Sequence, residues 1–174
     1  SKMINQGLVI GRFQLVGNQH VYLFDQIVEY HFNKEKLDRL NVAIEVADNV
    51  NARDPFSGAE CWKMIKPIAQ EAANKMKIPL DYRLVDDIHD PPNYPKHIER
   101  IFGFKPNMED RITLFSATEY TNESYKNKKG YKLVHPEERV NQHSTELRKL
   151  CVRGISLEGL VPEHIPKFLE ERNA

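Results

Sequence analysis

A short apolar run, followed directly by a glycine-led turn and a helical pattern, constrains the fold of this chain more than any other feature. The run Gly7–Gly11 has the pattern of a buried central strand bounded by glycine. From Asn18 to Tyr30, apolar residues recur at helical spacing. A strand, a turn and a helix in this order open a βαβ unit. We therefore expect a parallel sheet whose first strand leads into a helix.

The alternation of strands and helices continues to the C-terminus. Further strands are expected at 40–46, 80–85, 111–115 and 131–134, and further helices at 57–76, 95–102, 144–153 and 162–172. Ser57 and Glu60 form a capping box at the start of the second helix, and Pro67 predicts a kink or an early end within it. With no repeat or linker in the 174 residues, we expect a single domain over 1–174. Its expected fold is α/β, a Rossmann-like doubly wound parallel sheet with helices on both faces.

Composition narrows the classes of partner. Acidic and basic residues balance at 25 each, so no strong field favours nucleic acid or an anionic membrane. A small molecule or a protein is therefore the expected partner. The cytoplasm is the expected location, because the sequence shows no signal-like segment and no apolar run that approaches the ~18 residues of a membrane span. Cys61 and Cys151 lack metal-ligand spacing and suggest no disulfide framework. Asp86, Asp87 and Asp90 could suggest a metal cluster, but a solvated loop is favoured, because adjacent carboxylates on a strand point in opposite directions.

The first group of candidate site residues follows the first strand. Open α/β sheets bind ligands beyond the carboxyl ends of their strands, which directs attention to Gly11–His20. Free backbone N–H groups and the dipole at a helix start favour phosphate. Arg12 adds a forked donor suited to phosphate oxygens, and His20 could neutralise charge on a leaving group. The alternative is an ordinary tight turn in which glycine only permits the backbone path.

The second group precedes the helix expected at 144–153. Arg139 lies upstream, and Ser144 or Thr145 can cap the helix and offer donors at its positive end. Arg148 follows on the same helical face. Two helix starts with such donors could hold a triphosphate from two sides, whereas the alternative is an ordinary capped amphipathic helix with a solvated arginine.

With these two groups in order, the chain resembles the nucleotidylyltransferase superfamily, and most closely the archaeal-type nicotinamide mononucleotide adenylyltransferases. The resemblance covers nearly the whole chain from Gly7 onward. It is carried by Gly-Leu-Val-Ile-Gly-Arg-Phe-Gln at 7–14, Asp-Pro-Phe-Ser-Gly-Ala-Glu at 54–60, Val85 with Asp87 and Ile88, and Ser-Thr-Glu-Leu-Arg at 144–148.

The resemblance implies in-line attack by the phosphate of nicotinamide mononucleotide on the α-phosphate of ATP, giving NAD and pyrophosphate. It implies ATP and Mg²⁺ carried by the nucleotide as cofactors, no metal site of the protein's own, and a homo-oligomer, often a hexamer. Catalysis would consist of positioning and charge stabilisation, with His20, Arg12 and Arg148 as catalytic residues. The residues expected to bind the nucleotide are Gly11, Arg12, Phe13, Gln14, Gly17, His20, Asp87, Arg139, Ser144, Thr145 and Arg148.

The chain departs from the family pattern in the phosphate loop. After Gly-Arg-Phe-Gln the family has Pro-x-His-x-Gly-His, whereas this chain has Leu15, Gly17, Gln19 and His20 at the four defined positions. Only the second histidine is kept. In the second phosphate motif, His143 and Ser144 replace the family's serine and glycine, and His143 could approach the place of the missing first histidine.

Two classes of function follow from this departure. The first is an adenylyltransferase, making NAD or acting on another acceptor such as a flavin mononucleotide or phosphopantetheine compound. The second is a binding protein that senses or sequesters a nucleotide without turnover. Tyr94 and His97 could stack on a ligand ring or lie in a surface loop, and Trp62 is expected to serve packing.

Overall fold

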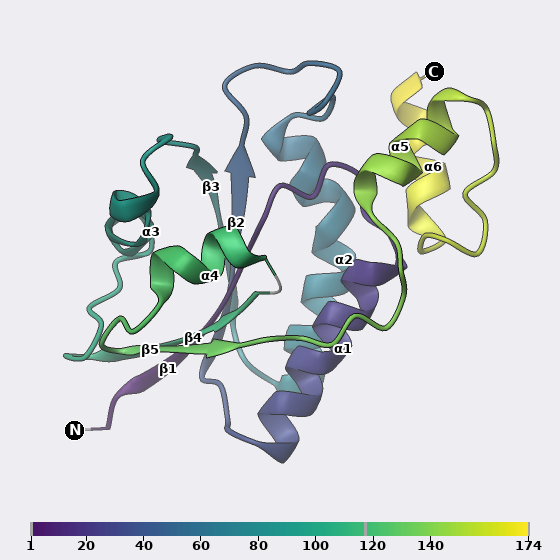
Figure 1. The fold of residues 1–174 in the computed structure, drawn as a ribbon. Coiled ribbons are helices and arrows are strands. Elements are labelled where there is room, and N and C mark those ends of the chain that lie inside the picture. Colours follow the sequence, from purple (N-terminus) through teal and green to yellow (C-terminus); the bar gives the residue numbers. More distant parts are fainter. Residues whose placement is uncertain (1, 117, 174) are drawn as a thin grey trace.

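The computed structural model describes residues 2–116 and 118–173, and within them five parallel strands form a sheet in the order β3–β2–β1–β4–β5 (Figure 1). The strands are β1 (Ile4–Gly11), β2 (Arg39–Val46), β3 (Leu80–Asp86), β4 (Asp110–Phe115) and β5 (Tyr131–Val134). Gly11 pairs in register with Ile44 on one side of β1, and Val9 pairs with Phe115 on the other.

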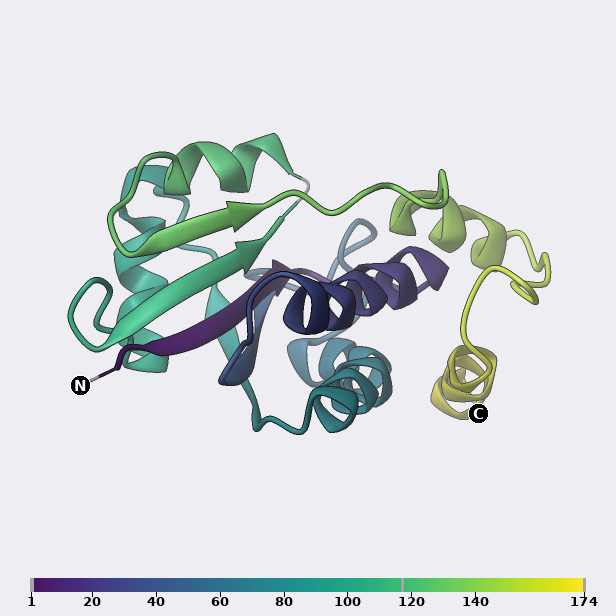
Figure 2. The ribbon, with the colours of Figure 1, turned by 90° about the horizontal axis from the view of Figure 1, so that it is seen from below.

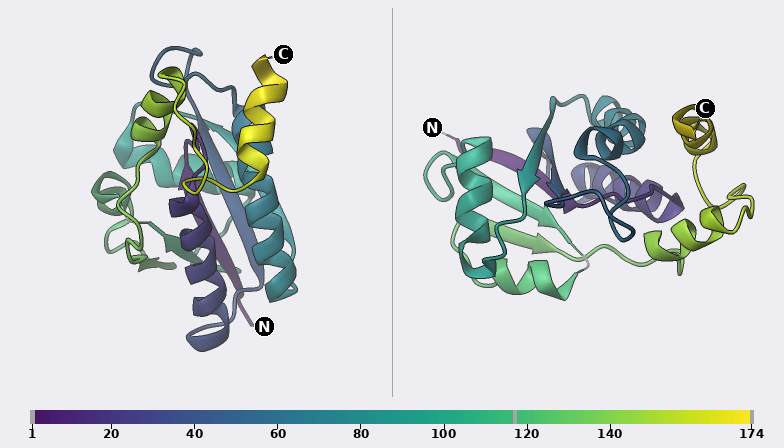
Figure 3. Two further views of the ribbon diagram at one scale, coloured as in Figure 1. Left: turned by 90° about the vertical axis from the view of Figure 1, so that its right-hand side faces the viewer. Right: turned by 90° about the horizontal axis from the view of Figure 1, so that it is seen from above.

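Helices cover both faces of this sheet. They are α1 (Asn18–Asn33), α2 (Gly58–Met76), α3 (Tyr94–Phe102), α4 (Glu119–Tyr125), α5 (Ser144–Val152) and α6 (His164–Asn173), with a 3₁₀ turn at Pro91–Asn93 before α3. Helices α1 and α2 lie side by side along one face (Figure 3). Helices α3 and α4 lie on the other face, while α5 and α6 lie beyond the sheet, near the start of α1 (Figure 2). This arrangement confirms the α/β, Rossmann-like sheet with helices on both faces.

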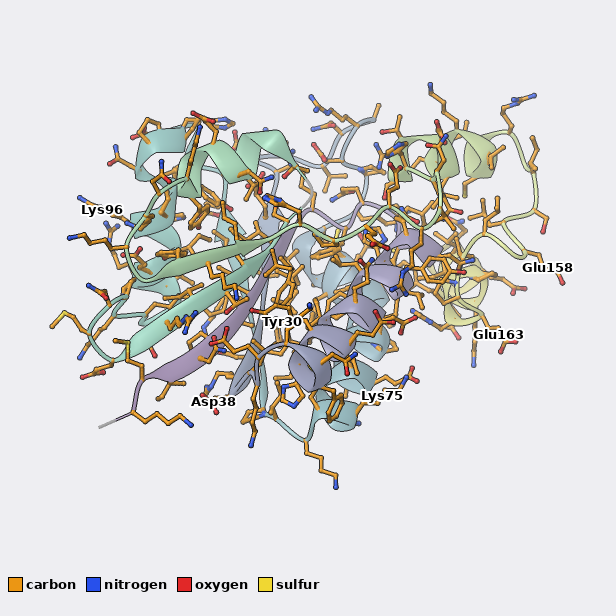
Figure 4. The ribbon with its side chains drawn as sticks, turned by 60° about the horizontal axis from the view of Figure 1, so that its bottom comes forward. Tyr30, Asp38, Lys75, Lys96, Glu158 and Glu163 are labelled. Carbon is orange, nitrogen blue, oxygen red and sulfur yellow. The ribbon has the colours of Figure 1, made fainter. Side chains whose placement is uncertain are left out.

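Alternation along the strands divides the core between the two faces. Val9 and Val42 belong to the apolar cluster under α1 and α2, whereas the neighbouring Leu8 and Ala43 belong to the cluster under α3 and α4. Successive strand residues point to opposite faces, so a central strand must be apolar on both. Tyr30 of α1 lies in the interior against Phe115, with ring centroids 5.2 Å apart, while Lys96, Glu158 and Glu163 lie at the periphery (Figure 4).

The strand order changes direction at β1. From β1 the chain passes through α1 to β2 and then to β3 on one side, and it then returns to form β4 on the other side of β1. The carboxyl ends of β1 and β4 therefore flank the switch point at which doubly wound sheets bind ligands.

The start and length of α2 test two local predictions. Ser57 Oγ accepts the Glu60 N–H at 3.2 Å and Glu60 Oε1 accepts the Ser57 N–H at 3.0 Å, which confirms the capping box. The early end predicted at Pro67 is wrong, because α2 continues through this residue to Met76. Tertiary packing of the apolar face of α2 on the sheet outweighs the lost backbone hydrogen bond. Helix α4 was not predicted from the sequence.

Candidate functional site

A cavity of about 430 Å³ lies at the switch point, between α1 and the segment 136–143 that follows β5. Its floor is formed by the ends of β1 and β4. Its lining residues are Val9–Phe13, Gln19, His20, Tyr22, Leu23, Gln26, Phe115, Ser116, Thr118, Pro136–Val140, Gln142 and His143. The cavity is large enough for part of a nucleotide, since small-molecule sites usually span about 300–1,000 Å³.

The loop between β1 and α1 has an unusual backbone. Phe13 and Leu15 have positive φ angles, of 52° and 108°, although neither is glycine. Burial holds this path in place, because Leu15 is fully buried and Phe13 is 5% exposed. The proline found at position 15 in the resembled motif could not adopt this conformation, because its ring holds φ near about −65°. This backbone path therefore excludes proline at position 15.

His20 lies in the first turn of α1 and contributes to the cavity lining. Its Nδ1 accepts the backbone N–H of Gly17 at 3.1 Å, so the ring proton of the neutral imidazole resides on Nε2. Burial, the largest cause, lowers the pKa of His20 from 6.5 to about 4. At neutral pH His20 is consequently an uncharged donor at the positive end of a helix.

Arg12 is held by carboxylates from three separate segments. Its guanidinium contacts Glu45 at 3.0 Å, Asp54 at 3.1 Å and Asp87 at 2.9 Å. Burial acts to lower the pKa of Arg12, but the carboxylates outweigh it and the pKa is raised. The Nε, Nη1 and Nη2 atoms of Arg12 thus each donate to a carboxylate of the protein. A phosphate would have to compete with these carboxylates for the guanidinium.

Gln14 is buried and joins the loop to the chain before α2. Its Nε2 donates to the Phe56 carbonyl at 2.8 Å, and its Oε1 accepts the Phe56 N–H at 2.9 Å. Its backbone carbonyl accepts a hydrogen bond from Arg148 Nη1 at 2.7 Å, and Arg148 Nη2 reaches Thr145 Oγ1 at 3.2 Å. Burial lowers the pKa of Arg148. The hydrogen bond between Gln14 and Arg148 thus joins the loop after β1 to helix α5.

The space above Gly17 is filled by side chains of two segments, Gln19 of α1 and Gln142 with Leu147 at the start of α5. A Cβ atom at this position would overlap Gln19 Oε1 and Gln142 Nε2 and would approach Leu147 Cδ1 to 2.6 Å. The backbone of Gly17 is extended, with φ of −125°, so the obstacle to a side chain here is space. His143 does not occupy the place of the missing histidine. Its neighbour Gln142 does.

The predicted capping at α5 is wrong. His143 is the N-cap residue and makes no side-chain cap. The hydroxyl of Ser144 instead donates to the Leu15 carbonyl at 2.8 Å, and Thr145 accepts from Arg148. Arg148 and Thr145 do share one helical face, as predicted.

The structure brings only part of the predicted set to the cavity. Gly11, Arg12, Phe13, His20 and Arg139 line it. Gln14, Gly17, Asp87, Ser144, Thr145 and Arg148 lie around it without contributing to its lining. Arg139 is paired with Glu29 at 2.8 Å. Whether any of these residues binds a nucleotide stays a prediction.

Several cavity residues were missed by sequence reasoning. Gln19 was interpreted only as a departure from a motif, and Gln26 and Gln142 were not singled out. The Nε2 of Gln26 donates to the Glu137 carbonyl at 2.9 Å and its Oε1 accepts the Glu137 N–H at 2.7 Å, so this residue fastens the segment that closes the cavity. Such pairings between distant segments leave no periodic signal in the sequence.

Tyr94 and His97 lie apart from the cavity lining. Both belong to α3, with ring centroids 6.2 Å apart, and Tyr94 packs against the apolar cluster under α3 and α4. Trp62 serves packing as predicted, since its ring stacks on Tyr82 at a centroid distance of 3.9 Å. Among residues 2–116 and 118–173, no group of three or more His, Cys, Asp or Glu side chains is placed to hold a metal ion, and none of the described helices is long and apolar enough to cross a membrane.

Known proteins resemble this chain in structure but not detectably in sequence. No protein-family model matches the sequence, and no curated protein matches it. The structure is similar to that of a bifunctional NMN adenylyltransferase/ADP ribose pyrophosphatase from Francisella tularensis complexed with AMP and a Mn ion, with a TM-score of 0.69 and 16% identity over 99% of this chain. A second structure of that bifunctional protein gives a TM-score of 0.70 at 16% identity.

The chain spans about half the length of these two proteins, 50% and 51%. A candidate nicotinate-nucleotide adenylyltransferase from Vibrio parahaemolyticus is also similar, with a TM-score of 0.60 and 13% identity over 96% of this chain and 99% of that one. At 13–16% sequence identity, these structural similarities show a shared fold and do not by themselves show a shared function. The chain therefore has the Rossmann-like α/β fold of these adenylyltransferase structures.

Proposed function

We propose that this chain is a nucleotidylyltransferase that transfers AMP from ATP to nicotinamide mononucleotide, giving NAD and pyrophosphate. The observation that carries the proposal is the position of His20. It lies at the start of α1, in a cavity at the switch point of the sheet, and its Nε2–H is available as a donor. The AMP named in one of the similar structures supports an adenine nucleotide as ligand.

The proposed reaction needs no nucleophile from the protein. Negative charge develops on the oxygens of the attacked α-phosphate and of the leaving pyrophosphate, and fixed donors directed at that charge lower the barrier. His20 would donate from Nε2, with its orientation fixed by the Gly17 N–H. Mg²⁺ brought in on ATP would neutralise phosphate charge. Arg139, at the cavity wall, would move from Glu29 to the nucleotide.

A second candidate is a nucleotide-binding relative without turnover, and two observations favour it. Arg12 is engaged by three carboxylates, and the space where the family carries its first histidine is filled by glutamine side chains. Both features reduce the positive charge available to a triphosphate. Removing one preorganised donor typically lowers the rate by about 10²–10³-fold.

The test is to incubate the purified protein with ATP, Mg²⁺ and nicotinamide mononucleotide and to measure NAD and pyrophosphate by chromatography. We expect product from the unmodified protein and a loss of about 10²-fold or more in His20→Gln. ATP binding without product, with product gained only by Gly17→His/Gln19→Gly/Gln142→Ala, would establish the second candidate. If neither ATP nor AMP binds, both proposals fall.

A further inference from the structure

Two glutamines occupy the place that the missing histidine leaves at the cavity. Gln19 and Gln142 both line it, and their amides meet above Gly17, where Gln142 Nε2 lies 2.6 Å from Gln19 Oε1. We propose that the side-chain amide of Gln19 is the donor to the leaving pyrophosphate and that Gln142 is the positioning residue that orients it. The inference rests on the proposed function, because it assigns the pyrophosphate end of the nucleotide to this part of the cavity.

The orientation of both amides follows from one backbone carbonyl, that of Leu160. The Leu160 carbonyl can only accept, so the Gln142 atom that lies 2.7 Å from it must be Nε2. That nitrogen also contacts Gln19, and it can donate only to an acceptor, so the Gln19 atom facing it is Oε1. The Nε2 of Gln19 must therefore face the opposite way, toward α5.

The hydroxyl of Ser144 completes this chain of donors and acceptors. It gives its proton to the Leu15 carbonyl at 2.8 Å and so offers only lone pairs to Gln19. Gln19 Nε2 lies 3.4 Å from that oxygen, a long contact. A primary amide nitrogen carries two hydrogens. Among the described residues, Ser144 Oγ is the acceptor within reach of the Gln19 amide nitrogen. At least one N–H of Gln19 is therefore left for a ligand oxygen.

This donor lies beside His20 and near two helix starts. Gln19 and His20 are neighbours in the first turn of α1, and the contact to Ser144 places the Gln19 amide at the first residue of α5. The dipoles of both helices favour negative charge there. Unlike an imidazole, an amide keeps its proton at every physiological pH, so its contribution to anion binding does not change with pH.

The experiment measures binding of two probes, inorganic pyrophosphate and AMP, by isothermal titration calorimetry. Gln19→Met keeps the length of the side chain and removes the donor, so we expect pyrophosphate to bind about 10- to 100-fold more weakly and AMP to change less than about twofold. Gln70→Met is the matched control, because Gln70 is an exposed glutamine of α2 that contacts Asn74 far from the cavity.

The role of Gln142 is tested by inverting the polarity of the contact. In Gln142→Glu, the carboxylate can only accept, so the Gln19 amide turns and presents its oxygen, in place of its N–H groups, on the side that faces Ser144. We expect this variant to bind pyrophosphate at least as weakly as Gln19→Met. Gln142→Met, which adds no charge, leaves the amide unoriented and should fall between that variant and the unmodified protein. In ¹H–¹⁵N spectra, pyrophosphate should shift the side-chain amide signals of Gln19 in the unmodified protein, and Gln142→Glu should abolish this shift.

The outcomes separate this inference from the proposed function. If Gln19→Met binds pyrophosphate as tightly as the unmodified protein, or if the unmodified protein does not bind pyrophosphate, the inference is wrong, even where NAD is formed. If pyrophosphate binding depends on Gln19 but no NAD is formed, the inference stands and the proposed reaction falls.

Discussion

Acidification should destabilise this protein through His20 in a way that one substitution removes. The folded protein holds the pKa of His20 at about 4, because burial disfavours the imidazolium, whereas the ordinary value is 6.5. Between these two values the unfolded chain binds a proton that the folded chain does not. Stability conferred by the neutral form is therefore fully present above pH 6.5 and is lost as the pH falls toward 4.

The size of the effect follows from the shift. Each unit of pH below 6.5 favours the unfolded state by about 1.4 kcal/mol, so lowering the pH from 7 to 5 should cost about 2 kcal/mol through His20. Burial also lowers the pKa of His31, so His31 too makes the free energy of unfolding fall on acidification. This effect is present both in the unmodified protein and in variants of His20. Its contribution cancels when the two proteins are compared.

The assay is urea unfolding of the unmodified protein and of His20→Gln at pH 7 and pH 5. We expect the free energy of unfolding to fall by about 2 kcal/mol more in the unmodified protein than in the variant. Glutamine keeps an acceptor for the Gly17 N–H and does not titrate. Equal losses in the two proteins would show that His20 is not held neutral by its surroundings and would refute the reasoning.

Three further predictions concern the end of β1 and the loop that follows it, each measured by urea unfolding at pH 7. Gln14→Leu leaves the buried N–H of Phe56 unpaired and leaves its carbonyl with the weak contact of the Cys61 thiol at 3.9 Å, so we expect a loss of about 2–4 kcal/mol. A loss below about 1 kcal/mol would contradict this role. Arg12→Met leaves three carboxylates together and should cost about 1–2 kcal/mol, with a smaller cost in 1 M NaCl; a cost that does not respond to salt would exclude repulsion as the cause. Gly11→Ala places a Cβ atom 2.9 Å from the Phe13 ring and should cost about 1–3 kcal/mol, whereas a neutral effect would show that the ring moves freely.

The order and type of most elements could be predicted from the sequence, because apolar periodicity reports burial directly. The strand predicted at 131–134 is found as Tyr131–Val134, and the helix predicted from Asn18 begins there. Helix α4 was missed because its seven residues, EYTNESY, are too short and too polar for a periodic signal. The early end predicted at Pro67 failed because tertiary packing overrides a local preference.

The candidate site was predicted in position but not in detail. The topological argument directed attention to Gly11–His20, and the structure places a cavity there. The partners of Arg12 come from three segments far apart in the sequence, and no spacing rule brings them together. The positive φ of Leu15 likewise depends on the burial of its side chain. Sequence reasoning looked to His143 for the missing donor, but an extended segment has no period that decides which residue faces the cavity.

The filling of the space above Gly17 has an evolutionary consequence. The side chain that fills it comes from Gln142, 123 positions along the chain from its partner Gln19. A single mutation to histidine at position 17 would meet both glutamines and destabilise the fold. A histidine at position 17 therefore requires coordinated changes in the two segments that carry Gln19 and Gln142. Substitutions that refine the amide pair are therefore more accessible to this chain than a histidine at position 17.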